Sequence, residues 1–356
     1  MKKTAIFALA LMMLLVGCKR GTDVSPDAAT EDVQVNNADT ETEGDKEQKP
    51  EQEPEAEKSV VNKAAWCVYW DSDPVNDTGS YSQYKEIVLF GCIYSEDHSL
   101  FIPEKLDKLA AEYHDKNPAG SHELYISFIN DIMHPDGTST QKSTDFLQTV
   151  LPDAELSDKV IDDMINQARI YGLDGIELDY ENIHKCDDLW GAYLDFISRL
   201  YKRAASSNLK LRVILSVSTP VDKLEFIDGP QYVVMCYNLY GSHTGPGPKA
   251  DEEFLRDTYN KFKDIKADYA LANGGFEWGP DNKTIRSLTA ADAEVLAKDK
   301  GAEISRNSNG TLNYSYEAGD GVHTVVYGDE QTIEKWNSVL LENADNDVGI
   351  NLWRLE

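Results

Sequence analysis

The chain has 356 residues and a formal net charge of −29, from 63 acidic and 34 basic residues. This length accommodates one large α/β domain. The charge argues against nucleic acids and anionic surfaces as partners, because phosphate binding needs clustered Lys and Arg. A neutral ligand is compatible with this balance, and a polyanion is not.

The N-terminus predicts export and a lipid anchor. Two lysines precede an apolar run over residues 5–17, which is too short to span a bilayer as a helix and is typical of a signal peptide. The run ends in LVGC, which resembles a bacterial lipobox. We therefore expect a lipoprotein signal peptide over residues 1–17 and a lipid on Cys18, which would hold the exported protein at a bacterial membrane. An ordinary secretory signal with an incidental cysteine is the alternative.

Residues 18–62 are predicted to be a disordered acidic tether. From Cys18 to Lys58 there are 13 acidic and 5 basic residues and no periodic apolar pattern. Such a segment buries too little apolar surface to offset the entropy lost on ordering. The folded domain is therefore expected over residues 63–356, and membrane contact only through the lipid on Cys18.

From residue 64 onward, strand-like and helix-like runs alternate. Eight strands are predicted at 65–70, 87–94, 124–129, within 171–182, and at 211–218, 232–237, 269–273 and 348–353. Apolar residues at helical spacing predict helices at 103–114, 157–171, 189–205, 251–263 and 330–343. The connection between the fifth and sixth strands is too short for a full helix. This order predicts a (β/α)8 TIM barrel, with functional groups at the C-terminal ends of the strands and the loop 71–81 opening onto that end.

One span interrupts the alternation. Between about residues 279 and 328, short strands are predicted at 302–306, 311–316 and 323–327, with turns at Asn309-Gly310 and Asp320-Gly321. We expect a small β-containing insertion between strand seven and the last helix.

The fourth strand carries an unusual acidic pattern. Glu177, Asp179 and Glu181 alternate with apolar or aromatic residues, so in a strand the three carboxylates share one face. An edge strand with its acidic face in water is the alternative, but the flanking helices favour a buried parallel strand. Ionising three crowded carboxylates together costs free energy because like charges repel, so the pKa of at least one of them should rise. This would provide an acid near neutral pH.

The sequence DGIELDYE at residues 174–181 resembles the DGxDxDxE signature of glycoside hydrolase family 18, which includes chitinases and endo-β-N-acetylglucosaminidases. The resemblance implies that Glu181 is the proton donor and that Asp179 positions the acetamido group of the substrate. Asp174 opens the motif. Glu177 stands where the family usually has Asp, and its extra methylene should repack the carboxylates without removing the acid.

The resemblance extends over most of the chain from residue 64. In MCYN, which resembles the family motif MxYD, Tyr237 would bind the acetamido oxygen, and Asn238 replaces a common Asp. Trp353 falls where the family keeps a tryptophan under the reactive sugar, since an indole stacks well on a pyranose. Packing roles are the alternatives for both aromatic residues.

Other parts of the groove are expected to differ from the family or to vary. Residues 127–130 replace the family's SxGG, so the groove floor should differ there, whereas residues 325–329 resemble the family's stretch before the last helix. The resemblance also implies that an insertion like the one at 279–328 walls one side of the groove. Candidates for outer sugar subsites are Trp70, Tyr240 and Trp278, each with a packing role as the alternative.

The resemblance implies retaining hydrolysis of β-1,4 linkages in N-acetylglucosamine glycans of the chitin or peptidoglycan type. The substrate's own acetamido group would be the nucleophile and form an oxazolinium intermediate. No metal or organic cofactor is expected, and a monomer is expected. The alternatives are a non-catalytic carbohydrate-binding surface protein on the same barrel, a surface scaffold or adhesin, or an endo-β-N-acetylglucosaminidase acting on N-glycans.

The four remaining cysteines are Cys67, Cys92, Cys186 and Cys236. Export permits disulfides. Three of the four lie in apolar strand-like runs, however, where a thiol behaves as a small hydrophobe. We expect most of them to be unpaired, and their spacing suits no zinc site.

Overall fold

A closed barrel of parallel strands organises the computed structural model, which describes residues 58–70, 82–116, 121–242 and 244–355. Within these residues the barrel strands are β1 (Val60–Val68), β2 (Glu86–Ser95), β4 (Glu123–Met133), β6 (Gly175–Asp179), β7 (Lys210–Ser216), β8 (Gln231–Met235), β9 (Asp268–Ala272) and β15 (Val348–Trp353). Pairing of β1 with β15 and of β2 with β4 closes the ring. The predicted (β/α)8 barrel is confirmed. The predicted signal peptide, Cys18, most of the predicted tether and the loop 71–81 lie outside the described residues.

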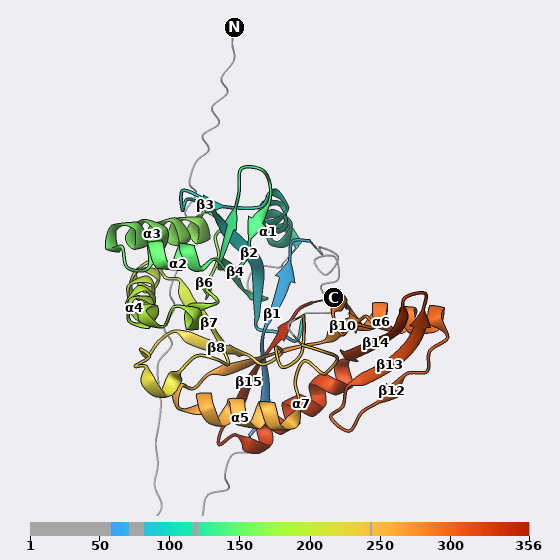
Figure 1. Cartoon of the computed structure of the whole chain (residues 1–356). Coiled ribbons are helices and arrows are strands. Elements are labelled where there is room, and N and C mark those ends of the chain that lie inside the picture. Colours follow the sequence, from blue (N-terminus) through green and yellow to red (C-terminus); the bar gives the residue numbers. More distant parts are fainter. Residues whose placement is uncertain (1–57, 71–81, 117–120, 243, 356) are drawn as a thin grey trace, which may run out of the picture. The chain divides into compact units, whose positions relative to one another are not determined.

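Helices cover the outside of the barrel (Figure 1): α1 (Glu104–Lys116), α2 (Thr144–Val150), α3 (Ala154–Ile170), α4 (Trp190–Ser206), α5 (Glu252–Phe262) and α7 (Glu330–Asn343). The helix α3 begins where the Asp153 side chain accepts the N–H of Leu156, and its apolar stripe is buried. Between β7 and β8 the described chain forms only a 3-10 turn, Val221–Lys223, as its length predicted. The short helix α2 was not predicted.

Alternation along the strands builds two separate cores. In β1, Ala65 and Cys67 face the helices, whereas Ala64 and Trp66 face the barrel axis. The axial core contains Ala64, Trp66, Val88, Tyr125, Ile214, Val233, Met235 and Ala270. In β6, Ile176 and Leu178 join the outer core. The acidic residues between them therefore point into the barrel.

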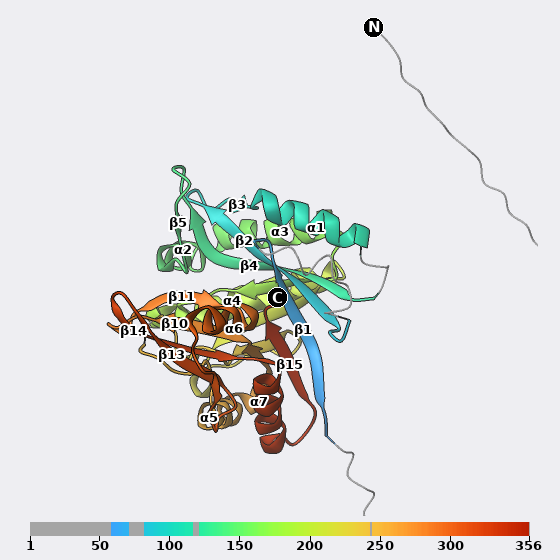
Figure 2. The same ribbon diagram turned by 90° about the vertical axis from the view of Figure 1, so that its right-hand side faces the viewer.

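The insertion is a second, antiparallel sheet. Its strands are β10 (Gly274–Trp278), β11 (Thr284–Leu288), β12 (Ser305–Arg306), β13 (Leu312–Ala318) and β14 (Gly321–Gly328), in the order β11-β10-β14-β13-β12. The helix α6 (Ala290–Lys300) lies against this sheet (Figure 2), with Ala293 and Ala297 in its core. The sheet begins at Gly274, earlier than predicted. A Cβ atom on Gly275 would lie 1.9 Å from the Val326 carbonyl oxygen, so only glycine fits the close pairing of β10 with β14.

Two short strands extend the barrel sheet above the ends of β2 and β4. They are β3 (Leu100–Phe101), antiparallel to β2, and β5 (Ser139–Thr140), antiparallel to β4. The hairpin of β4 and β5 places residues 130–142 beside the C-terminal end of β6.

The described chain enters the barrel at the opposite rim. Val60 in β1 pairs with Val348, the first residue of β15. Just before it, Lys58 Nζ donates to the Ala344 carbonyl at 2.7 Å, and the Ser59 N–H donates to Asp347 Oδ1 at 2.7 Å. These bonds fix the start of β1 at the amino-terminal ends of the strands.

All four cysteines of the folded region are buried, and Cys92, Cys186 and Cys236 are thiols outside any disulfide, as expected. Burial raises the pKa of the Cys92 and Cys236 thiols. Among the described residues, no helix is both long and apolar enough to cross a membrane.

Candidate active site

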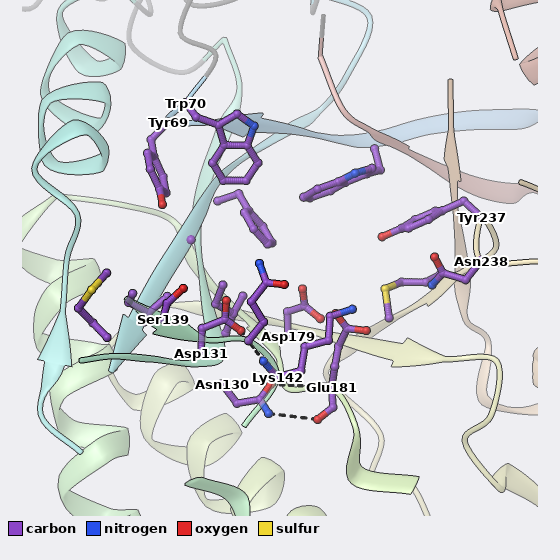
Figure 3. A pocket seen from close by; sticks show the side chains of 18 residues that line it. Tyr69, Trp70, Asn130, Asp131, Ser139, Lys142, Asp179, Glu181, Tyr237 and Asn238 are labelled. Atoms are coloured by element: carbon purple, nitrogen blue, oxygen red, sulfur yellow. Dashed lines mark hydrogen bonds and ion pairs between the residues drawn. The ribbon is translucent and has the colours of Figure 1, made fainter. Parts of the chain in front are cut away.

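A cleft of about 380 Å³ opens at the C-terminal ends of the barrel strands (Figure 3). Its described lining includes the carboxylates Asp131, Asp179 and Glu181, the cation Lys142, and aromatic rings of Tyr69, Trp70, Phe90, Tyr237 and Trp353. None of the described residues that line this cleft comes from the insertion at 274–328. The strand ends of a TIM barrel supply the cleft, as the fold requires.

The two acids of the motif both reach this cleft. Asp179 ends β6 and is 8% exposed, and its Oδ1 is buried without a hydrogen-bond partner among the described residues. Burial raises the pKa of Asp179 well above its usual range, and the carboxylates of Glu181 and Glu177 raise it further. Asp179 is therefore the crowded carboxyl that the alternating pattern predicted.

Asn130 fixes the backbone of Glu181. The Glu181 N–H donates to Asn130 Oδ1 at 2.8 Å, while Asn130 Nδ2 donates to the Glu181 carbonyl and to the Ser143 carbonyl, each at 3.1 Å. Asn130 is buried at the end of β4, where the sequence predicted only a changed groove floor. It joins the loop after β6 to the loop after β5.

Lys142 holds the Glu181 side chain, with Nζ 2.6 Å from Glu181 Oε1. The backbone of Lys142 is itself held on both sides: its N–H donates to Asp131 Oδ1 at 2.7 Å, and its carbonyl accepts from Asn182 Nδ2 at 2.9 Å. Its φ of 50° is unusual for a residue with a side chain. Burial raises the pKa of Asp131, although the Lys142 N–H and ammonium oppose this rise.

Glu177 lies below the cleft in a buried ion pair. Its Oε1 accepts from Trp66 Nε1 at 2.6 Å, and its Oε2 accepts from Arg212 Nε at 3.0 Å. Arg212 also donates to Glu86 and, at 3.0 Å, to Asn351 Oδ1. Burial raises the pKa of Glu177, and Arg212 opposes the rise. The longer acid thus binds a buried arginine in the barrel axis, a partner that the sequence analysis missed.

Aromatic rings form another part of the cleft. Tyr237 and Trp353 lie nearly parallel, with ring centres 6.3 Å apart and 16° between planes, and Phe90 contacts Trp353 edge-on at 4.7 Å. Trp70 is 51% exposed and meets Tyr69 edge-on at 5.0 Å. Burial raises the pKa of Tyr237, and Asp179 raises it further, so the phenol remains a hydrogen-bond donor.

The remaining predicted site residues divide between the cleft and the framework. Asn238 lines the cleft beside Tyr237. Asp174 lies at the other end of β6, where its Oδ2 accepts the Leu124 N–H at 2.9 Å and joins β6 to β4. Its role is structural.

Two aromatic candidates lie away from the described cleft lining. The Tyr240 ring lies against Gly247, leaving no room there for a Cβ. Trp278 is completely buried in β10, with its ring edge-on to Phe276 at 5.7 Å. The expectation that Trp278 contacts sugar is wrong, because a completely buried indole cannot stack on a ligand. Across the described chain, no cluster of three or more His, Cys, Asp or Glu residues could hold a metal ion.

Comparison with known proteins identifies the fold. No protein-family model matches the sequence, and no curated protein matches it in sequence. Among solved structures, a chitinase from Chromobacterium violaceum superposes with a TM-score of 0.67 at 16% identity, over 83% of this chain and 94% of that one. The spore cortex-lytic enzyme SleL of Bacillus cereus gives a TM-score of 0.66 at 20% identity, over 85% and 72%.

A third similar structure contains a bound oligosaccharide. It is a GH18 chitinase from Cycas revoluta in complex with (GlcNAc)3, with a TM-score of 0.61, 16% identity, and coverage of 82% of this chain and 94% of that one. The barrel of this chain therefore has the fold of family 18 chitinases and SleL-like glycosylases.

Proposed function

We propose that the chain is a retaining glycoside hydrolase that cleaves β-1,4 linkages in N-acetylglucosamine-containing glycans. The observation that carries this proposal is the meeting of Asp179, Glu181 and Tyr237 in one cleft with Trp353. A fold shared with chitinases, one of them bound to (GlcNAc)3, supports the choice of substrate.

The reaction takes place in two steps in this proposal. Glu181 protonates the glycosidic oxygen while the acetamido carbonyl oxygen of the substrate attacks C1, so the C1–O bond breaks and an oxazolinium ion forms. Asp179 Oδ1, which lacks a partner among the described residues, accepts the acetamido N–H, and Tyr237 donates to the carbonyl oxygen. Water then loses a proton to Glu181, attacks C1 and opens the ring with retention. Sugars without a 2-acetamido group should not be cleaved.

The test compares the wild type with Glu181→Gln on chitooligosaccharides, peptidoglycan and a high-mannose glycoprotein, with products identified by mass spectrometry. We expect kcat to fall by about 100- to 10,000-fold, because a positioned general acid contributes this much. Glu317→Gln, on an exposed position of β13, is the matched control. Retained turnover in Glu181→Gln with normal unfolding would remove Glu181 from the role. Glycan binding without product in the wild type would favour the non-catalytic alternative.

We also propose that the protein is exported, processed at Cys18 and held at a bacterial membrane by a lipid on that residue. The LVGC sequence after an apolar run supports this address. Mass spectrometry of the N-terminal peptide should find a diacylglyceryl group on the Cys18 sulfur. A Cys18→Ser variant that stays membrane-bound and fully processed would contradict the proposal.

A further inference from the structure

Lys142 is the one cationic side chain in the described lining of the cleft, among three carboxylates. The charge of the whole chain, −29, repels anions. A single ammonium beside the proton donor therefore supplies the one positive charge in the described lining, at the place where the glycosidic bond would lie. Lys142 is not part of the DGxDxDxE motif, so the motif does not explain its position in the cleft.

Two hydrogen bonds hold the Lys142 backbone in place, whereas its side chain is partly exposed to solvent. Asp131 and Asn182 bind the N–H and the carbonyl of Lys142, at 2.7 and 2.9 Å. The Lys142 side chain is 48% exposed, whereas the Glu181 side chain is 20% exposed. A fixed main chain with a half-exposed ammonium is suited to exchanging one anionic partner for another.

The present partner of Lys142 cannot persist through the reaction. The ion pair requires an ionised Glu181, but protonation of the glycosidic oxygen requires that Glu181 carry a proton. Asp131 acts on the ammonium through its charge and uses Oδ1 to bind the Lys142 N–H, and Asp179 is buried beneath. Glu177 is held by Arg212. When Glu181 takes up its proton, the ammonium loses its ion-pair partner.

We propose that Lys142 is a specificity-determining residue that binds a carboxylate on the substrate, next to the linkage that is cleaved. The preferred substrate is then an N-acetylated glycan with an acidic substituent, such as the lactyl ether of a muramic-acid-type sugar in peptide-free peptidoglycan strands, and not neutral chitin. This inference rests on the proposed function. The substrate carboxylate replaces Glu181 as the partner of Lys142, which frees Glu181 to accept a proton, and no covalent bond of the protein changes.

The acidic surface of the chain repels a strand that carries one carboxylate per disaccharide. Lys142 offsets this repulsion only for the carboxylate that is bound in the cleft.

The test uses three probes: peptide-free glycan strands with free lactyl carboxylates, the same strands with these groups amidated, and neutral chitooligosaccharides. The wild type should cleave the carboxylate strands with a kcat/KM about tenfold above that of the amidated strands, as expected for a charge-assisted bond.

Lys142→Gln should raise KM for the carboxylate strands and abolish this preference. The ratio of its kcat/KM on amidated strands to its kcat/KM on chitooligosaccharides should stay as in the wild type. Lys142→Arg should keep the preference. Lys283→Gln, at an exposed lysine of the insertion, is the control.

Equal losses on all three probes in Lys142→Gln would overturn the inference, because they would indicate a purely structural lysine. So would a wild type that does not distinguish free from amidated strands. Calorimetric binding of the same probes separates this inference from the proposed function. If no probe is cleaved, the proposed hydrolysis fails, yet tighter binding of carboxylate strands that Lys142→Gln abolishes still supports the role of Lys142. Equal binding of both strands would overturn it.

Discussion

Arg212 Nε lies 3.0 Å from Glu177 Oε2, and both side chains are completely buried in the barrel axis. The glutamate of the acidic motif is thus neutralised from below by a residue of the next strand, β7. This ion pair lies inside the barrel below Asp179. It explains how the barrel accommodates the carboxylate of Glu177 in addition to those of Asp179 and Glu181.

Replacing Arg212 by Met should lower the free energy of unfolding by about 3–5 kcal/mol, because Glu177 and Glu86 would remain buried without their cation. Urea unfolding followed by circular dichroism measures the change. Arg199→Gln is the matched control, since Arg199 binds Asp158 and Asp195 at the surface and should cost less than about 1 kcal/mol. Equal effects of the two substitutions would refute the assigned role of Arg212.

Asn130→Ala should lower kcat roughly tenfold with little change in KM, because the lost hydrogen bonds to the backbone of Glu181 position the acid. Steady-state kinetics on a soluble N-acetylated glycan measures both constants. Asn313→Ala, in the β12–β13 hairpin of the insertion, removes two side-chain hydrogen bonds of a residue that does not line the cleft, and it serves as the control. An unchanged kcat in Asn130→Ala would show that Glu181 keeps its position without Asn130.

The raised pKa of Asp179 predicts a pH-dependent stability. The folded state binds this proton more tightly than the unfolded state does, so stability falls as pH rises from the usual Asp value of about 3.9 to the raised value. Above the raised value the loss is complete. Unfolding free energies across this range should fall more steeply for the wild type than for Asp179→Asn. Parallel curves for the two proteins would contradict a raised pKa.

Asp329, at the start of α7, is expected to give a pH dependence of stability with the opposite sign. Arg306 binds Asp329, and this ion pair is the largest cause that lowers the pKa of Asp329 to about 2. The contribution to stability is present above the usual Asp value of about 3.9 and is lost as pH falls towards 2. Asp329→Asn, which keeps a good cap residue, should therefore lose up to about 1 kcal/mol at neutral pH, and this deficit should shrink as pH falls from about 4 towards 2. A deficit that stays constant over this range would mean that the charge is not responsible.

The barrel could be predicted because apolar residues repeat with one period in its strands and with another in its helices. Ile176 and Leu178 had to face one side of a strand and Glu177 and Asp179 the other, and the structure confirms this. Tyr237 and Trp353 could be placed in the cleft because both stand at strand ends, which meet at one rim of a parallel barrel.

The residues that the sequence did not reveal depend on tertiary structure. Lys142 lies between two short elements and carries no periodic pattern, so only the β4–β5 hairpin brings it to Glu181. Arg212 stands in an apolar strand, where its inward direction becomes meaningful only once the barrel has closed. Trp278 was misassigned because an aromatic residue of a buried strand and one at a sugar subsite look alike in sequence.

The bonds of Lys58 and Ser59 have a mechanical consequence. They place the point at which the described chain joins the barrel at the rim opposite the cleft, so a pull applied at Lys58 is borne by β1 and β15 at their starts.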